Sequence, residues 1–530
     1  MMATSSTHAK SQSWYYKAIV CFFSVAVVFS WVAWATFWDA GLYGDNVEQF
    51  VWVHRLQWGY YKHPPMPTWL LGGAMALIGQ HSWLTNALAA LCVAGTGWLT
   101  WLIARHLFDE KIAATAIVLW TLQQAFSVSA QIYNHNTVLV LFMAATVYAA
   151  LRATSADGHL AWWLMMGVGA AGAMLSKYQA GLPLLFLLIA LLATNTLRLR
   201  PFVLRLLAAM AGFLFLFTPH LHWAILNHFP ALGYASGALH SGDFAHRLAW
   251  VGSFFVNQIR MLLPLLLTLG ASLVVYKFRK TSGPYLSAFS TAERLPQCAD
   301  EIPVGRSADL ATVRPAANAK LQFMDASNIW MWALLWLPIL VVVTISLISG
   351  SELRNHWGVQ LFQFVSIWIA WQMRRSGILH FSSLIPIALA VHAIGLGYYA
   401  VKQSNPNAVQ AERRADSAYP AVDLAASALA HWRLQTACPL KIVGGDFEAG
   451  LAAAFMKEFP VTYTSPRATP WVTTDDIKKN GILHVLDMNS TLPATAVAAK
   501  RWYFNQAVPP TGKYVQFAVS LPTDTCEPMR

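Results

Sequence analysis

The chain has 530 residues, of which 56% are hydrophobic and only 11% are charged. Soluble domains carry roughly 25% charged residues, so this composition excludes an ordinary cytosolic protein. The formal net charge is +12, but most lysines and arginines stand at the ends of apolar segments, where they orient a membrane protein. The basic balance therefore does not indicate a nucleic-acid partner.

The apolar segments predict a polytopic, mainly α-helical membrane protein. Many of them reach the roughly 20 residues that a helix needs to cross a bilayer, and we count about eleven. The first apolar run lacks a small-residue cleavage site, which favours an uncleaved helix over a signal peptide. Residues 64–80 begin with prolines and are expected to lie along the membrane interface. In chain order, the predicted membrane segments are 18–38, 84–105, 112–132, 137–153, 160–176, 180–197, 203–219, 250–275, 328–349, 357–373 and 377–400.

The basic residues predict how these segments are oriented. The N-terminus and stretches 105–111, 198–205, 277–280 and 374–375 are basic and fall on one side if about eleven segments cross. The positive-inside rule makes this side cytoplasmic. The unusual polar clusters and the C-terminal region then face outward. We therefore expect a multi-pass protein of the cytoplasmic (inner) membrane with an extracytoplasmic, periplasmic C-terminal domain.

Residues 405–530 change character and predict a small soluble α/β domain beside a membrane domain of residues 1–404. KIVGGD, ILHVLDM and YVQFAVSLP are typical of strands, and FEAGLAAAFMKEF and TTDDIKKNG are typical of helices. The GGD at 444–446 is interpreted as a turn, since no phosphate-binding loop surrounds it.

The five cysteines show no metal-binding spacing. Cys21 and Cys92 fall in apolar segments and are expected to pack as small hydrophobic residues. Cys298 lies in a basic loop. Cys438 and Cys526 bracket the C-terminal region, so an extracytoplasmic location would favour a disulfide between them. The sequence leaves this pairing open because it does not give the bond geometry.

The stretch from Gly41 to Leu71, GLYGDNVEQFVWVHRLQWGYYKHPPMPTWLL, carries the clearest functional signal. It follows the first apolar segment and places charged residues among aromatics before two paired prolines. Charged groups held against a membrane are costly and mark functional sites. We therefore interpret the first outer loop, residues 39–71, as catalytic.

Asp45 and Glu48 are the candidate catalytic residues of this loop. A glycosyltransferase needs a carboxylate to accept the acceptor's proton as its hydroxyl or amine attacks the anomeric carbon. Burial near apolar walls would tune the basicity of Asp45. The structural alternative is a solvated loop carboxylate or a helix cap, since a helix could start at Gly44-Asp45. Glu48 lies one helical turn further on and either orients the acceptor or pairs with Arg55.

Lys62 and His63 precede Pro64-Pro65, and a proline holds the residue before it extended. A cation here suits the phosphate leaving group of a lipid-linked donor. The alternative is a lysine that reaches along the membrane surface. Lys177 has no acid near it in the sequence, which suits an anionic ligand, and Arg354 is a second phosphate-binding candidate.

Histidines are frequent after the seventh segment, but their spacing matches no ligand motif. We interpret them as loop and interfacial residues and predict no metal site from them. These histidines are His220, His222, His228, His240 and His246.

The loop GDNVEQFVWVHRLQWGYYKHPPMPTWL resembles the first outer loop of the protein-mannosyltransferase-like glycosyltransferases (glycosyltransferase family 39). This superfamily has the GT-C fold and includes the bacterial transferases that modify lipid A with aminoarabinose or galacturonic acid. YNHNTVLV, LSKYQAGL, PHLHW and NHW are supporting matches in the expected order, within residues 15–400. The resemblance implies a polyprenyl-phosphate sugar donor and an inverting transfer without a nucleotide.

The resemblance also assigns roles. Asp45 falls on the family's presumed base, His63 on its histidine before the prolines, and Lys177-Tyr178 on its outward Lys-Tyr pair. The chain departs from the family at Asn46, Lys62 and Asn136, where the family has acids. Either Asp45 alone does the work of several carboxylates, or Glu48 substitutes. Some members bind a divalent metal. No cofactor is predicted here, a metal stays open, and no convincing ligand set is seen.

The candidate residues are Asp45 and Glu48 for catalysis; Lys62, His63, Lys177 and Arg354 for the donor phosphate; and Tyr61, Asn134, His135, Asn136, Tyr178 and His356 for substrate binding. The predicted activity is sugar transfer to a lipid, glycan or protein acceptor at the outer face of the membrane. The alternatives are a lipid-carrier flippase or transporter, whose charges would lie nearer the bilayer midplane, and a polysaccharide polymerase that uses a pyrophosphate-linked donor.

Overall fold

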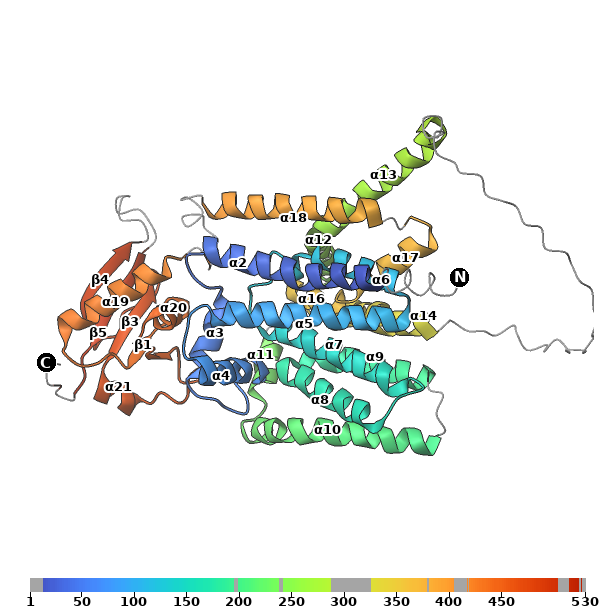
Figure 1. Cartoon of the computed structure of the whole chain (residues 1–530). Helices are drawn as coiled ribbons and strands as arrows, with labels where there is room; N and C mark the ends of the chain where they lie inside the picture. Colours follow the sequence, from blue (N-terminus) through green and yellow to red (C-terminus); the bar gives the residue numbers. More distant parts are fainter. Residues whose placement is uncertain are drawn as a thin grey trace, which may run out of the picture.

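The computed structural model describes residues 13–194, 199–237, 242–286, 326–378, 381–404, 417, 419–503, 514–523 and 526. Cys298 and His240 lie outside these residues. Figure 1 shows a bundle of long helices that run in similar directions, with a small sheet domain at one end. The sequence prediction of a mainly helical membrane protein with a small C-terminal sheet domain is confirmed.

Among the residues that the structure describes, six helical stretches are long and apolar enough to cross a membrane: Ser13–Trp38, Leu84–Leu107, His135–Thr154, Arg200–Leu226, Ala326–Ser349 and Ser383–Gln403. A seventh crossing is possible if Phe244–Met261 and Leu263–Phe278, which meet at 62°, count as one broken span. Within these stretches lie α2 (Val28–Trp38), α5 (Leu84–Leu107), α7 (His135–Thr154), α10 (Leu199–Leu226), α12 (Phe244–Met261), α13 (Leu263–Leu286), α14 (Ala326–Met331), α15 (Leu337–Ser349) and α18 (Phe381–Gln403).

The other predicted segments form shorter helices. Segments 160–176 and 180–197 correspond to α8 (Leu160–Ser176) and α9 (Gly181–Thr194). Segment 112–132 is predicted too long, because α6 (Glu110–Thr121) ends eleven residues earlier. Segment 357–373 is broken into a 3-10 turn and the helices α16 (Gly358–Leu361) and α17 (Val365–Arg375).

The error at segment 112–132 has a physical cause. Leu122, Phe126 and Ala130 are all buried, although they lie beyond the end of α6. Residues in an irregular but buried stretch are as apolar as those of a helix. Hydrophobicity alone therefore does not reveal where α6 ends.

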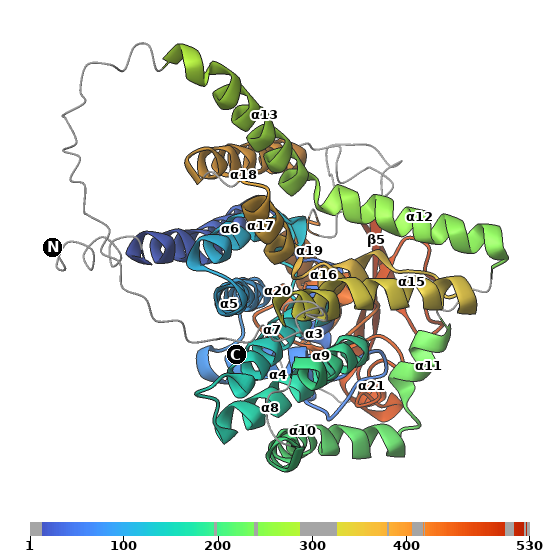
Figure 2. The ribbon, with the colours of Figure 1, turned by 90° about the vertical axis from the view of Figure 1, so that its right-hand side faces the viewer.

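One end of the bundle collects charged residues. Arg374 lies 3.8 Å from Asp109, and Arg105 lies 3.3 Å from Glu110. The Ser13 hydroxyl donates to Glu110 over 3.4 Å. Such exposed ion pairs add little stability, but they show that three of the predicted basic stretches share one end. That end lies opposite the sheet domain in Figure 1. Figure 2 shows α13 extending away from the other helices, with α18 beside its base.

The sheet of the C-terminal domain has the strand order β2-β1-β3-β5-β4. β1 is parallel to β2 and β3, while β5 is antiparallel to β3 and β4. The domain contains α19 (Ala421–Gln435), β1 (Ile442–Gly444), α20 (Phe447–Phe455), β2 (Val461–Tyr463), α21 (Thr474–Asn480), β3 (Ile482–Asp487), β4 (Val497–Tyr503) and β5 (Tyr514–Ser520). The three predicted strands and two predicted helices are confirmed. Cys438 and Cys526 form the disulfide that the sequence left open.

The first outer loop is held between the bundle and the sheet domain. It contains α3 (Gly44–Val53) and α4 (Met66–Ile78). Val47 and Phe50 of α3 share one apolar core with Leu451 of α20 and Leu483 of β3. A side chain at Gly450 of α20 would place its Cβ 2.7 Å from Val47 and 2.9 Å from Val51, so the two helices approach closely. The sheet domain thus fixes the position of α3.

Asp39 joins the end of α2 to α18 and gives a first prediction. Tyr399 donates to its carboxylate over 2.7 Å, and Gln403 also donates to it. Burial nevertheless raises the pKa of Asp39 from 3.8 to about 6. The folded protein therefore binds this proton more tightly than the unfolded chain does, and stability falls as pH rises from about 4 to about 6.

We expect Asp39→Asn to remove this pH dependence. At pH 8 the variant should be more stable than the wild type by ~1–3 kcal/mol, since one pKa unit corresponds to about 1.4 kcal/mol. Thermal unfolding of the detergent-solubilised protein at pH 4 and pH 8 measures the effect. Asp423→Asn, which removes an exposed carboxylate of the sheet domain, is the control. A lower stability of Asp39→Asn at pH 8 would show that the ionised carboxylate supports the fold.

Candidate active site

Asp45 lies in the first turn of α3, and its side chain is exposed to solvent. The predicted alternative, a position at the start of a helix, is confirmed, although Tyr43 rather than Asp45 occupies the N-cap. The expectation that Asp45 lies buried near apolar walls is wrong, because its side chain is exposed. Asp45 instead lies next to the N-terminal end of α3, where the helix dipole is positive.

Asn134 orients the Asp45 carboxylate. Its Nδ2 donates to Asp45 Oδ2 over 2.7 Å. Its Oδ1 accepts the backbone N–H groups of Asn136 and Thr137 at 2.8 and 3.0 Å and so caps α7. Because one amide performs both tasks, the position of Asp45 is tied to the start of α7.

Glu48 lies one turn further along α3 and pairs with Lys62. The distance from Lys62 Nζ to Glu48 Oε1 is 2.8 Å, and the two side chains are 24% and 18% exposed. The predicted alternative of a Glu48–Arg55 pair is therefore wrong. Although burial alone lowers the pKa of Lys62, the adjacent Glu48 raises it above its ordinary value, so this lysine keeps its charge. The ring of Tyr234 lies 5.8 Å from the ammonium group.

Lys177 lies in the break between α8 and the short 3-10 turn Tyr178–Ala180. Its Nζ donates to Asn136 Oδ1 over 2.9 Å. Burial lowers the pKa of Lys177 to about 8, with Asp45 opposing this shift and Lys62 adding to it. Lys177 is therefore a cation near Asp45, and its own hydrogen-bond partner is a neutral amide. An anionic ligand would stabilise the charged form of this lysine.

His63 and His135 lie against each other, with ring centroids 3.9 Å apart. Burial and the charges of Lys177 and Lys62 hold the pKa of His63 well below its usual range. Glu48, His63 and His135 each offer a ligand atom, and these atoms all lie within 4.8 Å of one another. This set has no signal in the sequence, because positions 48, 63 and 135 have no regular spacing.

Tyr178 is held by a histidine of α10. The Trp58 carbonyl accepts from Nδ1 of His220, which leaves Nε2 to accept the Tyr178 hydroxyl over 2.8 Å. His220 is buried, so its interpretation as a loop or interfacial residue is wrong. His222, His228 and His246 are exposed, as that interpretation expects. In the described part of the chain, no potential metal-binding group includes any of these four histidines.

Arg354 and His356 flank the same region. Arg354 lies 3.3 Å from Glu352, which partly balances its charge. Desolvation by the surrounding protein, together with the charges of Lys177, Arg354 and Lys62, lowers the pKa of His356 to about 3. Because Lys177 and Lys62 act on the ring of His356, this last outward cluster lies beside the first loop.

Two aromatic contacts connect Tyr61 to other parts of the chain. Its ring lies 6.0 Å from Tyr234 of α11 (Pro230–Gly237), and the guanidinium of Arg467 lies 5.9 Å from its centre. Tyr234 and Arg467 are not predicted from the sequence, because they stand in stretches without a motif. The sheet domain therefore contributes at least one side chain next to the loop.

Asn46 is a structural residue rather than a replaced acid. It is fully buried, and its amide donates to Thr85 and Asn86 while its oxygen accepts the backbone N–H of Tyr133. It holds α3 against α5 and the start of α7. The departure from the family at this position is thus accommodated by a complete set of hydrogen bonds.

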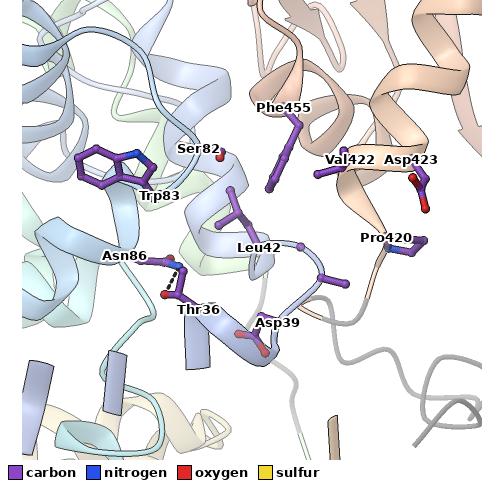
Figure 3. Close-up of a pocket in the computed structure, with 12 residues that line it drawn as sticks. Thr36, Asp39, Leu42, Ser82, Trp83, Asn86, Pro420, Val422, Asp423 and Phe455 are labelled. Carbon is purple, nitrogen blue, oxygen red and sulfur yellow. Dashed lines mark hydrogen bonds between the residues drawn. The ribbon is translucent and has the colours of Figure 1, made fainter. Parts of the chain in front are cut away.

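A pocket of about 380 Å³ lies beyond Asn46, where the bundle meets the sheet domain. Figure 3 shows Leu42, Val422 and Phe455 around it, with Asn86 bonded to Thr36 and with Asp39 at its edge. Asp45 does not line this pocket. We therefore place the candidate active site at the Asp45–Lys62–Lys177 cluster and not in this hollow.

Comparisons with known proteins relate the chain to membrane glycosyltransferases. Residues 62–223 match the family described as dolichyl-phosphate-mannose-protein mannosyltransferase. The lipopolysaccharide core galacturonosyltransferase RgtA of Rhizobium johnstonii is 28% identical over 187 residues, which cover 34% of this chain and 36% of RgtA. The crystal structure of ArnT from Cupriavidus metallidurans bound to undecaprenyl phosphate superposes with a TM-score of 0.50 at 13% identity, covering 95% of this chain and 98% of ArnT.

The predicted resemblance to this glycosyltransferase family is confirmed. The fold is similar to that of ArnT over nearly the whole chain. The family match begins at Lys62 and includes Lys177, Tyr178 and the Asn134–Asn136 stretch. The match does not reach Asp45, so the choice of Asp45 as a candidate catalytic residue rests on the geometry of the site. The chain matches only about a third of the length of RgtA.

Proposed function

We propose that this protein transfers a sugar from a polyprenyl-phosphate donor to a lipid, glycan or protein acceptor at the outer face of the cytoplasmic membrane. The observation that carries the proposal is the meeting of Asp45 with Lys62 and Lys177 in one cluster. An exposed carboxylate and two lysines suit proton removal from an acceptor and stabilisation of a phosphate. The ArnT structure that shares this fold was solved with undecaprenyl phosphate.

The proposed reaction is a single inverting displacement. Asp45, oriented by Asn134, takes the proton of the acceptor's hydroxyl or amine. The acceptor's electron pair attacks the anomeric carbon from the face opposite the phosphate. The bond between that carbon and the phosphate oxygen breaks, and the lipid phosphate leaves with the bonding electrons. Lys177 and Lys62 stabilise the charge that develops on it.

The remaining candidate residues support this chemistry. Arg354 and His63 surround the phosphate, while Tyr61, Tyr178 and His356 bound the space for the sugar and acceptor. Asn134, His135 and Asn136 set the positions of Asp45, His63 and Lys177 through direct contacts. Glu48 keeps Lys62 in place through their ion pair.

The proposal includes the arrangement in the membrane. All eleven predicted segments cross the bilayer, with α6, α8, α9 and α17 as short or tilted crossings beside the longer helices. The membrane domain comprises residues 1–404, and residues 405–530 form the domain outside the cytoplasm. Two observations favour this orientation: the basic stretches gather at the end of the bundle opposite the sheet domain, and that domain carries a disulfide.

The sheet domain offers a hollow of about 340 Å³ at the carboxyl ends of β1 and β3, lined by Asp446, His484 and Asp487 among others. Ligands of open α/β sheets bind at this edge. Burial raises the pKa of Tyr61, and the charges of Glu48 and, last, Asp446 add to this shift, so the hollow lies near the loop. Its polar walls suit a hydroxyl-rich acceptor, which could approach Asp45 from this side.

Purified protein in lipid nanodiscs tests the activity. With a polyprenyl-phosphate sugar and an envelope lipid extract, we expect release of free polyprenyl phosphate and a glycosylated product detected by mass spectrometry. Consumption of a pyrophosphate-linked glycan alone would support a polymerase instead. Movement of labelled donor across vesicle membranes with no sugar release would support a flippase.

A further inference from the structure

We propose that the pocket between the bundle and the sheet domain, here called the junction pocket, binds the head group of an amine-bearing phospholipid such as phosphatidylethanolamine. Its volume is about 380 Å³, within the roughly 300–1,000 Å³ of small-ligand sites. Its walls are both charged and apolar (Figure 3), and they include Asp39, Leu42, Trp83, Val422, Asp423 and Phe455. The site is independent of the proposed sugar transfer, because Asp45 does not line it.

The junction pocket lies where helices leave the membrane. Three stretches that are long and apolar enough to cross a membrane end or begin beside it: Ser13–Trp38, Leu84–Leu107 and Ser383–Gln403. The first ends next to Asp39, the second begins after Trp83, and the last residue of the third donates to the Asp39 carboxylate. Tryptophan is enriched at the membrane–water interface, and the Trp83 side chain is 47% exposed. The pocket therefore lies at the height of the lipid head groups.

The charges of its walls indicate a cationic group. Asp39 and Asp423 line the pocket, while no described lysine or arginine does. Tyr399 and Gln403, which donate to Asp39, are neutral. No ion pair among the described residues includes either acid, and the charge of Lys402 acts on Asp39 only from a distance. Two carboxylates that lack a paired cation suit an ammonium group, which forms strong hydrogen bonds with ionised acceptors.

The remaining walls favour an amphiphile over a simple amine. The indole of Trp83 attracts a cation placed over its face. Leu42, Phe455 and the exposed Val422 offer apolar contacts to the carbon atoms of a lipid. The lipid phosphate stays in the water outside, because the pocket has no basic partner for it. Burial raises the pKa of Asp39, and a bound ammonium would offset this effect by stabilising the ionised carboxylate.

The junction pocket is built from segments that are already tied together. Two backbone hydrogen bonds, over 2.9 and 3.1 Å, join residues 40–41 to Ser417 and Ala421. The Gln80 amide donates to the Ala454 carbonyl over 2.9 Å, which holds the loop before α5 against α20. Because these contacts fix the walls before a ligand arrives, binding requires little rearrangement.

Affinities for two lipids test the site. The full-length protein, stripped of lipid in detergent, is titrated with phosphatidylethanolamine that carries a fluorophore on one acyl chain. It should bind this lipid roughly 10–100-fold more tightly than phosphatidylglycerol with the same label and chains, the contribution of a hydrogen bond to a charged group. Asp423→Lys places a cation at the rim and should abolish this preference. Asp39→Asn keeps the shape of the side chain without its charge and should weaken the preference severalfold.

Asp475→Lys is the matched control. Asp475, like Asp423, is an exposed acid in the first turn of a helix of the sheet domain, but it does not line the pocket. It should leave the preference unchanged. Trp83→Ala should weaken the binding of phosphatidylethanolamine severalfold. Trp98→Ala, which removes an exposed indole further along the chain in α5, should not.

Two results would contradict the proposed site. Equal affinity for the two lipids, or a preference that survives both Asp423→Lys and Asp39→Asn, would overturn it. Free ethanolamine shares the ammonium group and lacks the chains, so it should compete far more weakly than unlabelled phosphatidylethanolamine. Equal competition by the two compounds would indicate a site for soluble amines and overturn the assignment to a lipid. None of these measurements depends on whether sugar is transferred.

Discussion

Asp45→Asn is expected to reduce the turnover number for sugar transfer by roughly 10²–10⁴-fold, the usual contribution of a general base. Asparagine has the same shape and can still accept the hydrogen bond from Asn134, so the start of α7 stays in place. It cannot take the acceptor's proton. Donor affinity should change little, because the cations that bind the phosphate are untouched. Single-turnover kinetics with a labelled polyprenyl-phosphate sugar separates the two effects.

Asp475→Asn is the control for this prediction. Asp475 is also an exposed acid in the first turn of a helix, α21, and it lies in the sheet domain. It should leave turnover unchanged. Near wild-type turnover by Asp45→Asn would remove the proposed base. Glu48→Gln would then be the next variant to measure, because Glu48 is the nearest acid along α3.

Lys177→Gln should weaken binding of the donor by roughly 10–100-fold, since a hydrogen bond to a charged group contributes about 1.5–3 kcal/mol. The wild type should also show pH-dependent affinity. Burial lowers the pKa of Lys177 to about 8, so the lysine is charged below this pH and loses its proton above it. Donor affinity should therefore fall between pH 7 and pH 9. Titration with fluorescent undecaprenyl phosphate measures both effects.

Two variants sharpen this second prediction. Lys177→Arg keeps the charge at all these pH values and should abolish the fall in affinity. Lys441→Gln removes a lysine of the sheet domain that is bonded to Asn480, and it should change nothing. A pH profile that is the same for Lys177→Gln and the wild type would show that another group titrates.

The sequence predicts those parts of the site that lie close together in the chain. Asp45, Glu48, Lys62 and His63 fall in one loop with an unusual composition, so the loop itself identifies them. The membrane segments and the strands of the C-terminal domain follow from apolar runs of the right length. Of the two alternatives for Glu48, pairing with Arg55 is wrong, because Lys62 reaches Glu48 once the loop turns at Tyr60–His63.

The missed contacts all depend on distant segments. His220 holds Tyr178, and Tyr234 and Arg467 lie against the first loop, yet none of the three has a local signal. The same holds for the group of Glu48, His63 and His135, which come together where α3 and the turn before Pro64 meet the start of α7. Asn46 shows the reverse case, since a departure from the family motif turns out to be a buried structural amide.

The central claim is that the Asp45 cluster meets a lipid-borne sugar outside the cytoplasm. Single cysteines introduced at two exposed positions, Arg55 in the first loop and Ser376 at the opposite end of the bundle, test it directly. Cys21, which is exposed, and Cys298 are both replaced by alanine in the two variants, while Cys92 is buried. In intact spheroplasts, a membrane-impermeant maleimide should label position 55 and not position 376. Labelling at 376 alone would put the cluster on the cytoplasmic side and contradict the account.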